Sequence, residues 1–290
     1  MEIRKAEVLG FCVGVRRAVQ IIEEEVKKGP LETLGAVVHN PHVVEKLEQR
    51  GAKVIRSLEE ARTGRVAITA HGVGEEVYRK LQERNLELID TTCPIVSRAQ
   101  RAAHKLAAEG FDIVIYGEAD HPEVRGILGW TGGRGVATLD PEVPLKIHRR
   151  RVALLAQTTK GEEAFVEFIS RFLKKHIAEL NEVRIVNTTC PETGKRYAAA
   201  EELARWADLM LVVGGRNSAN TRRLAETCAR AGAETYHIED AAEIRREWLQ
   251  GKERIGVTAG ASTPDEAIEA VIRRVEGLAS EPVKAEAEQG

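Results

Sequence analysis

The cysteines are the residues of this sequence whose spacing points most directly to chemistry. Cys93 and Cys190 lie in identical Thr-Thr-Cys-Pro tetrapeptides, each of which follows a short apolar run and precedes a helical pattern. Cys12 occupies the same place earlier in the chain, without the two threonines and the proline. A thiol at the start of a helix feels the positive end of the helix dipole, which favours the thiolate form. Because thiolates bind iron and zinc, these three cysteines are candidate metal ligands.

Two kinds of metal site fit three cysteines: a four-iron cluster with one iron open to substrate, and a zinc ion whose fourth ligand is water. Zinc ligands usually come in close pairs such as C-x-x-C, and this sequence has no such pair. Separations of 81 and 97 residues favour a large cofactor held between domains. A single cysteine here would more often be a small residue at a tight turn, but three at matching positions favour ligation. Cys228 has no counterpart in the repeat, and we expect it in a core.

Polar side chains recur at nearly constant distances after these cysteines. His39, His121 and Asn217 follow them by 27, 28 and 27 residues, each just after an apolar run. Later strands end at polar groups near positions 71, 158 and 262, which are 59, 65 and 72 residues after the same cysteines. One such histidine alone would more often be an ordinary surface or core residue, but the repetition favours a shared role. Helix starts bind anions through backbone N–H groups. The candidate anion-binding residues are His39, His71, His121, Ser218, Asn220 and Ser262.

Glu123 and Thr158 are the candidates for proton transfer. Glu123 follows His121 and a proline in a candidate catalytic loop. Near a neutral, thiol-rich cavity its carboxyl group would have a raised pKa and could deliver protons. The Thr158 hydroxyl would position a group or relay a proton. Alternatively, Glu123 is an acid at a helix start that complements the helix dipole, and the sequence leaves both interpretations open.

The elements that must position these residues form a repeated α/β pattern. Helical stretches follow the three cysteines at 16–28, 97–110 and 195–207, and apolar strands precede the polar clusters. Strands that alternate with helices predict parallel sheets, whose ligands gather outside the carboxyl ends of the strands. We therefore expect an α/β fold of three pseudo-threefold-related domains with parallel sheets around a central iron–sulfur cluster. The expected domains are 14–93, 94–190 and 191–279, the last completed by the N-terminal segment 1–13, with a disordered tail at 280–290.

Composition narrows the class of protein. The chain has 290 residues, of which 43% are hydrophobic and 30% charged, a balance typical of globular proteins. Its net charge of -2 gives no basic excess, so we expect no nucleic-acid partner. No apolar stretch reaches the roughly 20 residues that span a bilayer, and the N-terminus has no signal-peptide core, so we expect no membrane association. Four cysteines in a chain of this size favour reduced thiols, and hence a cytoplasmic protein.

Together these motifs resemble the 4-hydroxy-3-methylbut-2-enyl diphosphate reductase family. The matching segments occur in order along nearly the whole chain, at 10–18, 38–40, 70–73, 90–94, 121–123, 157–159, 187–191, 217–220 and 260–264. The resemblance implies a three-lobed α/β fold and one [4Fe–4S] cluster per subunit. It also implies reductive dehydroxylation of an allylic diphosphate to isopentenyl and dimethylallyl diphosphates, the last step of the non-mevalonate isoprenoid pathway, with electrons from ferredoxin or flavodoxin.

The resemblance also implies a role for each candidate residue. Iron would be bound by Cys12, Cys93 and Cys190. The substrate would be held by His39, His71, His121, Thr158, Ser218, Asn220 and Ser262. Catalysis would involve Glu123, Thr158 and His121. Ala219 departs from the family pattern, because some relatives have a second serine there; a backbone N–H would replace that contact.

Two other classes of protein fit some of the same residues. A cluster-dependent dehydratase would use the open iron without net electron transfer. A non-catalytic iron–sulfur sensor or ligand-binding protein would bind a small molecule without turnover. The family resemblance favours the reductase over both.

Overall fold

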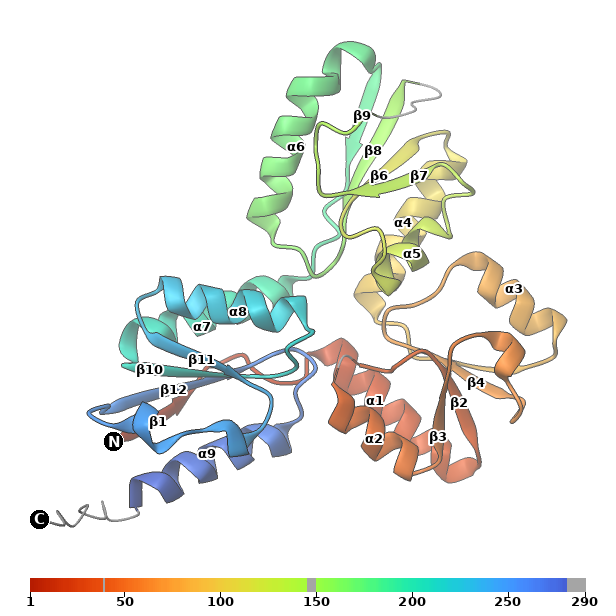
Figure 1. The fold of residues 1–290 in the computed structure, drawn as a ribbon. Helices are drawn as coiled ribbons and strands as arrows, with labels where there is room; N and C mark the ends of the chain where they lie inside the picture. The colour runs from red at the N-terminus through yellow and green to blue at the C-terminus, as the bar shows by residue number, and fades with distance from the viewer. Residues whose placement is uncertain (39, 145–149, 281–290) are drawn as a thin grey trace, which may run out of the picture. The chain divides into compact units, whose positions relative to one another are not determined.

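The computed structural model describes residues 1–38, 40–144 and 150–280. The expectations for His39 and for the tail beyond residue 280 therefore fall on positions outside the described residues. The chain forms two compact units, one made of residues 1–12 together with the part from 195 onward, and the other of residues 13–194. Within the described residues they contain three four-stranded sheets, all with parallel neighbouring strands (Figure 1). The prediction of three α/β units with parallel sheets is thereby confirmed, whereas the limits of the individual repeats stay a prediction.

Sheet B follows Cys12 in the chain and has the strand order β3-β2-β4-β5. Leu81 of α3 packs with Ile55 and Val66 on one face of the sheet. Glu23 of α1 forms an ion pair with Arg50, the C-cap residue of α2. The elements are α1 (Val13–Glu25), β2 (Leu31–Leu34), α2 (Pro41–Gln49), β3 (Ala52–Ile55), β4 (Arg65–Ile68), α3 (Glu75–Glu83) and β5 (Glu87–Asp90), with short 3-10 helices η1 (Val26–Lys28) and η2 (Leu58–Glu60).

Sheet C follows Cys93 and has the order β7-β6-β8-β9. Alternate residues of β6 point to opposite faces: Ile113 and Ile115 pack against α4 and α5, while Val114 packs against the phenylalanines of α6. The sheet is thus covered by helices on both faces. The elements are α4 (Pro94–Ala108), β6 (Asp112–Tyr116), α5 (Pro122–Leu128), β7 (Gly135–Thr138), β8 (Arg151–Ala156), α6 (Glu162–His176), η3 (Ile177–Glu179) and β9 (Glu182–Ile185).

Sheet A has the order β1-β12-β10-β11, so the N-terminal strand completes a sheet built mainly from the C-terminal third of the chain. Leu209, Leu211 and Val213 of β10 pack against α9. Met210 and Val212, which point to the other face, pack against α7 and α8. The elements are β1 (Glu2–Lys5), α7 (Pro191–Trp206), β10 (Leu209–Val213), α8 (Ala219–Arg230), β11 (Glu234–Ile238), η4 (Ala241–Glu243), η5 (Arg246–Leu249), β12 (Arg254–Ala259) and α9 (Asp265–Ser280).

All three sheets have the same connectivity. The first strand after the opening helix is central, the second lies on one side of it, and the third lies on the other side, followed by an outer strand. The chain therefore changes direction across the sheet between β2 and β4, between β6 and β8, and between β10 and β12. In open α/β sheets, ligands bind outside the carboxyl ends of the strands at such switch points. The polar clusters found in the sequence follow these pairs of strands.

The helices α4 and α7 begin earlier than the sequence pattern predicts. They start at Pro94 and Pro191, whereas the periodic pattern predicted starts at 97 and 195. Proline is favoured at the first helical position because its fixed φ suits the helix and its missing N–H has no helical partner there anyway. The consequence is that the cysteine before each proline lies immediately at the helix start.

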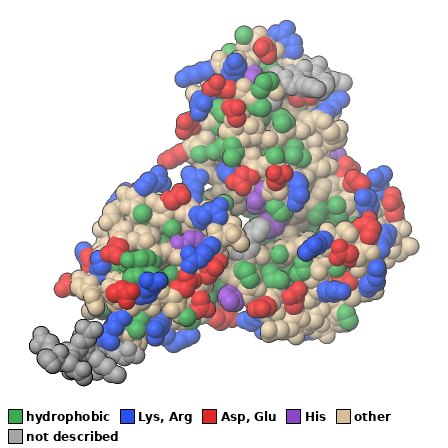
Figure 2. Space-filling model, in the orientation of Figure 1, with side chains coloured by type: hydrophobic (Ala, Val, Ile, Leu, Met, Phe, Trp, Pro, Cys, Tyr) green, Lys and Arg blue, Asp and Glu red, His purple; other side chains and the backbone are tan. Residues whose placement is uncertain are grey.

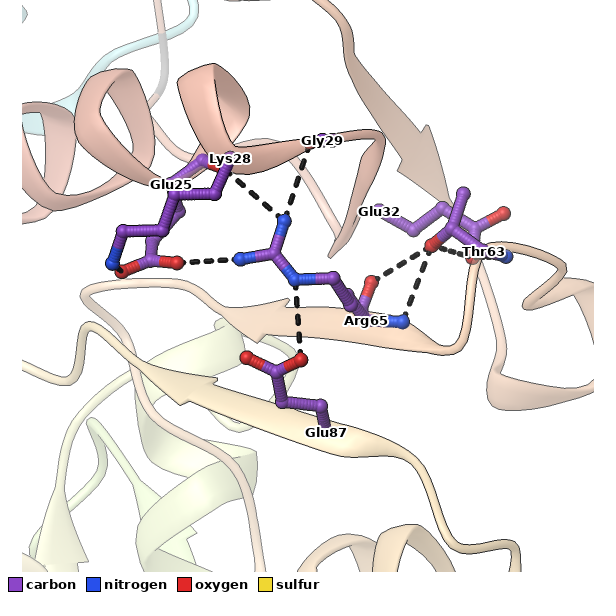
Figure 3. Close-up of polar contacts among 7 residues, drawn as sticks. All are labelled: Glu25, Lys28, Gly29, Glu32, Thr63, Arg65 and Glu87. Carbon is purple, nitrogen blue, oxygen red and sulfur yellow. Dashed lines mark hydrogen bonds and ion pairs between the residues drawn. The ribbon is translucent and has the colours of Figure 1, made fainter.

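The amino ends of the strands in sheet B are fastened by charged side chains (Figure 3). Arg65 at the start of β4 donates to the carbonyls of Glu25 and Gly29 at 3.1 and 3.2 Å, and its guanidinium pairs with the carboxylates of Glu25 and Glu87. The contacts tie the end of the first helix to two strands. The amino ends of these strands therefore carry contacts that stabilise the sheet, whereas the polar clusters follow the carboxyl ends of the strands.

Two findings bear on possible partners. On the face shown in Figure 2, acidic and basic side chains are interspersed, in keeping with the net charge of -2. Within the described residues, no helix combines the length and the apolar character that crossing a bilayer requires.

Candidate functional site

The backbone at each of the three repeat cysteines makes the same hydrogen bond. The amide of Cys93 donates to the carbonyl of Ala70 at 3.0 Å, and Ala70 lies two residues beyond the last residue of β4. The other two cysteines do the same, each to the residue two positions beyond the end of the third strand of its sheet: Cys190 to Thr158 at 2.8 Å after β8, and Cys12 to Ala261 at 3.2 Å after β12. The repeat read from cysteine spacing is therefore also a repeat of backbone geometry.

The Thr-Thr-Cys-Pro sequence is explained by the turn that it forms. The first threonine hydroxyl donates to the last carbonyl of the neighbouring strand at 2.6 Å in both copies, Thr91 to Ile68 and Thr188 to Ala156. The residue before the motif accepts from the amide of the second threonine, through the side chain of Asp90 or Asn187 in the respective copy. These contacts hold the segment that ends at each cysteine.

Sheet A lacks the threonine, and an arginine takes its place. Arg196 of α7 is 2% exposed, and its Nη1 donates to the carbonyl of Ala259, the last residue of β12, at 2.9 Å. Ala259 is the counterpart of Ile68 and Ala156. The sequence offered no signal for this exchange, because Arg196 comes from another part of the chain than Cys12.

The three repeat cysteines are half-buried thiols, whereas Cys228 is fully buried. Burial raises the pKa of Cys190; the amides of Glu192 and Thr193 at the start of α7 oppose this, and the nearby Cys93 thiol adds to the rise. Burial raises the pKa of the Cys228 thiol to about 12, and its sulfur lies among the core residues of α7, α8 and β10. The prediction that Cys228 is a core residue is confirmed.

The donor set of the repeat cysteines suits an iron–sulfur cluster chemically. Each is an accessible thiol at the carboxyl edge of a parallel sheet, and two of them precede a proline at the first turn of a helix. Cys12 belongs to one compact unit, and Cys93 and Cys190 belong to the other. Over the ranges that the structure describes, no group of three or more His, Cys, Asp or Glu side chains is gathered as a metal site.

Glu123 and Thr158 lie together in the interior. The Glu123 side chain is on α5 and only 2% exposed, and its two carboxylate oxygens accept from the amide and hydroxyl of Thr158 at 2.6 and 2.9 Å. Burial raises the pKa of Glu123, although the two hydrogen bonds from Thr158 and the charge of Lys160 partly offset the rise. A carboxyl group in this setting keeps its proton to higher pH than an exposed glutamate and can act as an acid. Cys190 is next to this pair, because its amide donates to the Thr158 carbonyl.

His71 and His121 meet edge to face, with their ring centroids 5.5 Å apart. His121 is the N-cap of α5, and its Nδ1 accepts from the amide of Glu123 at 3.2 Å. In the neutral ring the proton must then lie on Nε2, which makes this atom a hydrogen-bond donor. The structure thus brings together His71, His121, Glu123, Thr158, Cys93 and Cys190, all in the unit of residues 13–194.

The loop that carries His71 is held by side chains that the sequence did not single out. The Val73 carbonyl accepts from Gln100 Nε2 at 3.2 Å and from Trp130 Nε1 at 2.9 Å. The backbones of Gly74 and Gly129 pack so closely that a Cβ on Gly129 would lie 2.5 Å from the Gly74 Cα. Periodicity along the chain carries no signal for such contacts, since the partners are far apart in sequence.

The other candidate anion ligands lie at the carboxyl edge of sheet A. Ser218 is the N-cap of α8, and its Oγ accepts from the Thr221 amide at 3.3 Å, which leaves the hydroxyl proton able to point outward. The Asn220 Oδ1 accepts from the Tyr197 hydroxyl at 3.0 Å. Ser262 is half-buried, and it lies between Ala261, which accepts from Cys12, and Thr263, whose hydroxyl donates to Val213. These residues and Cys12 thus share one edge of one sheet, whereas His39 lies outside the described residues.

Comparison with known proteins gives a consistent result over most of the chain. The sequence model of the family described as "LytB protein" matches residues 3–276. A protein named 4-hydroxy-3-methylbut-2-enyl diphosphate reductase from Dehalococcoides mccartyi is 45% identical over 274 residues, which is 93% of this chain and 96% of the relative. A protein of the same name from Geobacter sulfurreducens is 42% identical over 278 residues, which is 95% of this chain and 97% of the relative.

Two solved structures are also similar. One is described as "Structure of (E)-4-Hydroxy-3-methyl-but-2-enyl Diphosphate Reductase, the Terminal Enzyme of the Non-Mevalonate Pathway"; it is 38% identical, has a TM-score of 0.73, and the match covers 95% of this chain and 99% of that one. The other is the E-1-hydroxy-2-methyl-but-2-enyl-4-diphosphate reductase from Plasmodium falciparum, at 24% identity and a TM-score of 0.83, with 93% of this chain and 86% of that one covered. The second match supports the fold alone.

Proposed function

Because this chain belongs to the LytB protein family, we propose that it removes the hydroxyl group of (E)-4-hydroxy-3-methylbut-2-enyl diphosphate reductively. The products would be isopentenyl and dimethylallyl diphosphates, in the last step of the non-mevalonate isoprenoid pathway. The observation that carries the proposal is the match over nearly the whole chain to relatives that bear the name of this reductase. The repeated cysteine turns and the buried Glu123–Thr158 pair supply groups that suit such chemistry.

The proposed cofactor is one [4Fe–4S] cluster per subunit, ligated by Cys12, Cys93 and Cys190. The three thiols have equivalent backbone hydrogen bonds, which supports equivalent roles. When bound, such a cluster supplies electrons and an iron that accepts an oxygen ligand as a Lewis acid. Cys228 is excluded from this set by its place in the core.

The substrate diphosphate is proposed to be bound by neutral donors and histidines rather than by lysines. With Nδ1 accepting from the Glu123 amide, the neutral His121 ring carries its proton on Nε2, and both this atom and the Ser218 hydroxyl are hydrogen-bond donors by their chemistry. The start of α8, where backbone N–H groups point outward, would add to them at the Ser218 side. The complete proposed set is His39, His71, His121, Thr158, Ser218, Asn220 and Ser262.

Proton delivery is proposed for Glu123, with Thr158 and His121 assisting. Loss of hydroxide is difficult at neutral pH, and protonation converts the leaving group into water. Burial raises the pKa of the Glu123 carboxyl group, which favours its protonated form relative to that of an exposed glutamate. Its two hydrogen bonds from Thr158 fix the carboxyl plane, and the Thr158 hydroxyl can pass a proton onward because it both donates and accepts.

The electron donor is proposed to be ferredoxin or flavodoxin, and the compartment the cytoplasm. All four cysteines lie in the described part of the chain and none of them forms a disulfide there, in keeping with a reducing compartment. The donor follows from the family resemblance rather than from a surface feature of the molecule.

The test is an anaerobic assay of reconstituted protein with the hydroxylated diphosphate and a reduced donor in excess. We expect two electrons to be consumed for each molecule of product, with both isomeric diphosphates formed. Turnover at the same rate without any reductant would identify a dehydratase and contradict the proposal. Ligand binding without turnover in either condition would identify a sensor or binding protein instead.

A further inference from the structure

The two polar atoms of the Asn220 amide differ in their hydrogen bonding. Its Oδ1 accepts from the Tyr197 hydroxyl at 3.0 Å, while its Nδ2 is buried and has no hydrogen-bond partner among the described residues. A buried N–H donor that is left without an acceptor destabilises the protein, so such groups usually mark a bound water, ion or ligand. Nδ2 is thus a candidate donor to a bound ligand.

Tyr197 is well placed to fix this orientation. It lies on α7, and its ring packs against the buried cluster that includes Ala200, Leu224 and Cys228. The guanidinium of Arg223 lies over the ring, 5.3 Å from its centroid. Burial raises the pKa of the Tyr197 hydroxyl, so it keeps its proton and remains a donor over the ordinary range of pH.

The orientation of an asparagine amide decides what it can bind. With Oδ1 engaged by a hydroxyl, the amide presents its NH₂ end, which donates to an anion; turned by 180°, it would present an oxygen that repels one. Ser218, two residues earlier, has its Oγ occupied as an acceptor by the Thr221 amide, so its proton is also free to be donated. Both side chains are therefore set as donors at the same helix start.

We propose that Tyr197 is a positioning residue whose hydroxyl holds the Asn220 amide so that Nδ2 donates to an oxygen of the diphosphate group. The inference rests on the proposed function, which assigns Asn220 to the diphosphate. It adds a residue from α7, a different helix, that acts on the substrate only through Asn220. Hydrogen bonds to charged groups are stronger than neutral ones, so a misdirected amide should weaken binding measurably.

The experiment uses Tyr197→Phe, which removes one oxygen atom and keeps the ring that packs on the core. In the reconstituted enzyme we expect KM for the diphosphate substrate to rise about 10-fold while kcat changes by less than about 2-fold, because a charge-assisted bond is weakened before the chemical step. The dissociation constant of inorganic pyrophosphate, measured by calorimetry, should rise by a similar factor. Tyr236→Phe is the matched control, since this tyrosine of β11 donates to Glu234 and should leave both values unchanged.

A double-mutant cycle with Asn220→Ala separates the inference from the function on which it rests. Asn220→Ala should raise KM at least as much as Tyr197→Phe, and adding Tyr197→Phe to Asn220→Ala should have less than about a 2-fold further effect. If Asn220→Ala weakens binding but Tyr197→Phe does not, or if the two effects multiply, the positioning role is overturned while the assignment of Asn220 stands. If Asn220→Ala changes neither KM nor pyrophosphate binding, the assignment of Asn220 to the diphosphate fails first, and Tyr197 has nothing to position. The pyrophosphate measurement needs no turnover, so it tests the positioning role even if the protein proves not to be a reductase.

Discussion

The carboxyl group of Glu123 is buried, and its hydrogen-bond donors come from a different element of the fold. Its oxygens accept two hydrogen bonds from Thr158, which follows β8, while its own backbone lies in the first turn of α5. An acid that merely complemented the dipole of a helix would be expected at the surface, because that interaction needs no burial. The raised pKa of Glu123 instead suits a proton donor, and the neighbouring Thr158 hydroxyl suits a relay.

We predict that Glu123→Gln preserves the cluster and substrate binding but slows the chemical step about 10²–10⁴-fold, the usual contribution of general acid catalysis. Glutamine keeps the size of the side chain and an acceptor oxygen, but it cannot donate a proton as an acid. Single-turnover reduction under anaerobic conditions, with reduced donor in excess, measures this step separately from electron supply. A rate close to that of the parent, with a stability loss of only about 0.3–1 kcal/mol, would instead identify a helix-start acid.

Glu32 shows a buried carboxylate with the opposite shift. It is 1% exposed; burial alone would raise its pKa, but hydrogen bonds from the amides of Thr63 and Arg62 and from the Thr63 hydroxyl outweigh this, so the pKa is lowered. A carboxylate whose pKa is lowered by folding stabilises the folded state above its unfolded pKa, and this contribution is lost as the pH falls through the folded pKa.

We predict that Glu32→Gln lowers the free energy of unfolding at pH 7 by about 1–3 kcal/mol, because two backbone N–H groups lose a charged acceptor. The difference from the parent should shrink as the pH falls below about 4.3, where the glutamate of the unfolded chain becomes protonated. Urea unfolding at several pH values measures both. Glu87→Gln is the control, since Glu87 is 61% exposed in its pair with Arg65 and should matter by less than about 1 kcal/mol. A difference that does not depend on pH would show that the charge of Glu32 is not what stabilises this corner.

At the scale of elements, close backbone contact positions the loop of His71. The turn after α5 packs against the segment before α3, and both contact residues are glycines, Gly129 and Gly74. The carbonyl of Val73, next to Gly74, accepts hydrogen bonds from Trp130 in the turn after α5 and from Gln100 on α4. The loop is thus held by backbone proximity and by two side-chain donors at once.

We predict that Gly129→Ala lowers stability by about 1–3 kcal/mol and raises KM, because its Cβ would lie 2.5 Å from the Gly74 Cα and backbone must shift to admit it. Thermal unfolding and steady-state kinetics measure the two effects. Gly277→Ala is the matched control: nothing lies within 4 Å of its would-be Cβ, and it lies inside helix α9, so alanine should be neutral or stabilise by about 0.5–1 kcal/mol. If both substitutions behave alike, the Gly74–Gly129 contact does not hold the loop.

The sequence predicted the elements well where the signal is local. The apolar runs before the polar clusters, and the recurrence of a helix after each repeat cysteine, were sufficient to predict three units with parallel sheets. It placed the starts of α4 and α7 too late, because apolar periodicity begins only after the proline turn. Contacts such as Trp130 to Val73, or Tyr197 to Asn220, could not be predicted, because they join segments whose proximity depends on tertiary packing.

At the scale of the whole molecule, the same strand order and cysteine turn occur three times, with changes in sheet A. The three sheets share a strand order, and each repeat cysteine donates to the residue two positions beyond the end of the third strand of its sheet. Sheet A differs in two respects: its outer strand β1 comes from the N-terminus, and Arg196 replaces the missing threonine. Spacing revealed the repeat, but the exchange of threonine for arginine was visible only in the folded chain.

The repeat leads to a prediction about all four cysteines. If the pattern exists to supply cluster ligands, Cys12→Ser, Cys93→Ser and Cys190→Ser should each lose most of the iron and sulfide that the parent takes up on anaerobic reconstitution, since a serine oxygen is a poor substitute for a thiolate toward iron. Cys228→Ser should reconstitute like the parent, because its sulfur lies in the core of α7, α8 and β10. Placing a hydroxyl there destabilises the fold by about 1–3 kcal/mol, so its thermal midpoint should fall while its iron content does not. Iron and sulfide counted per folded chain keep the two effects apart. Equal loss of iron from all four variants would mean that cysteine substitution acts through folding, and the inference from spacing to ligation would no longer hold.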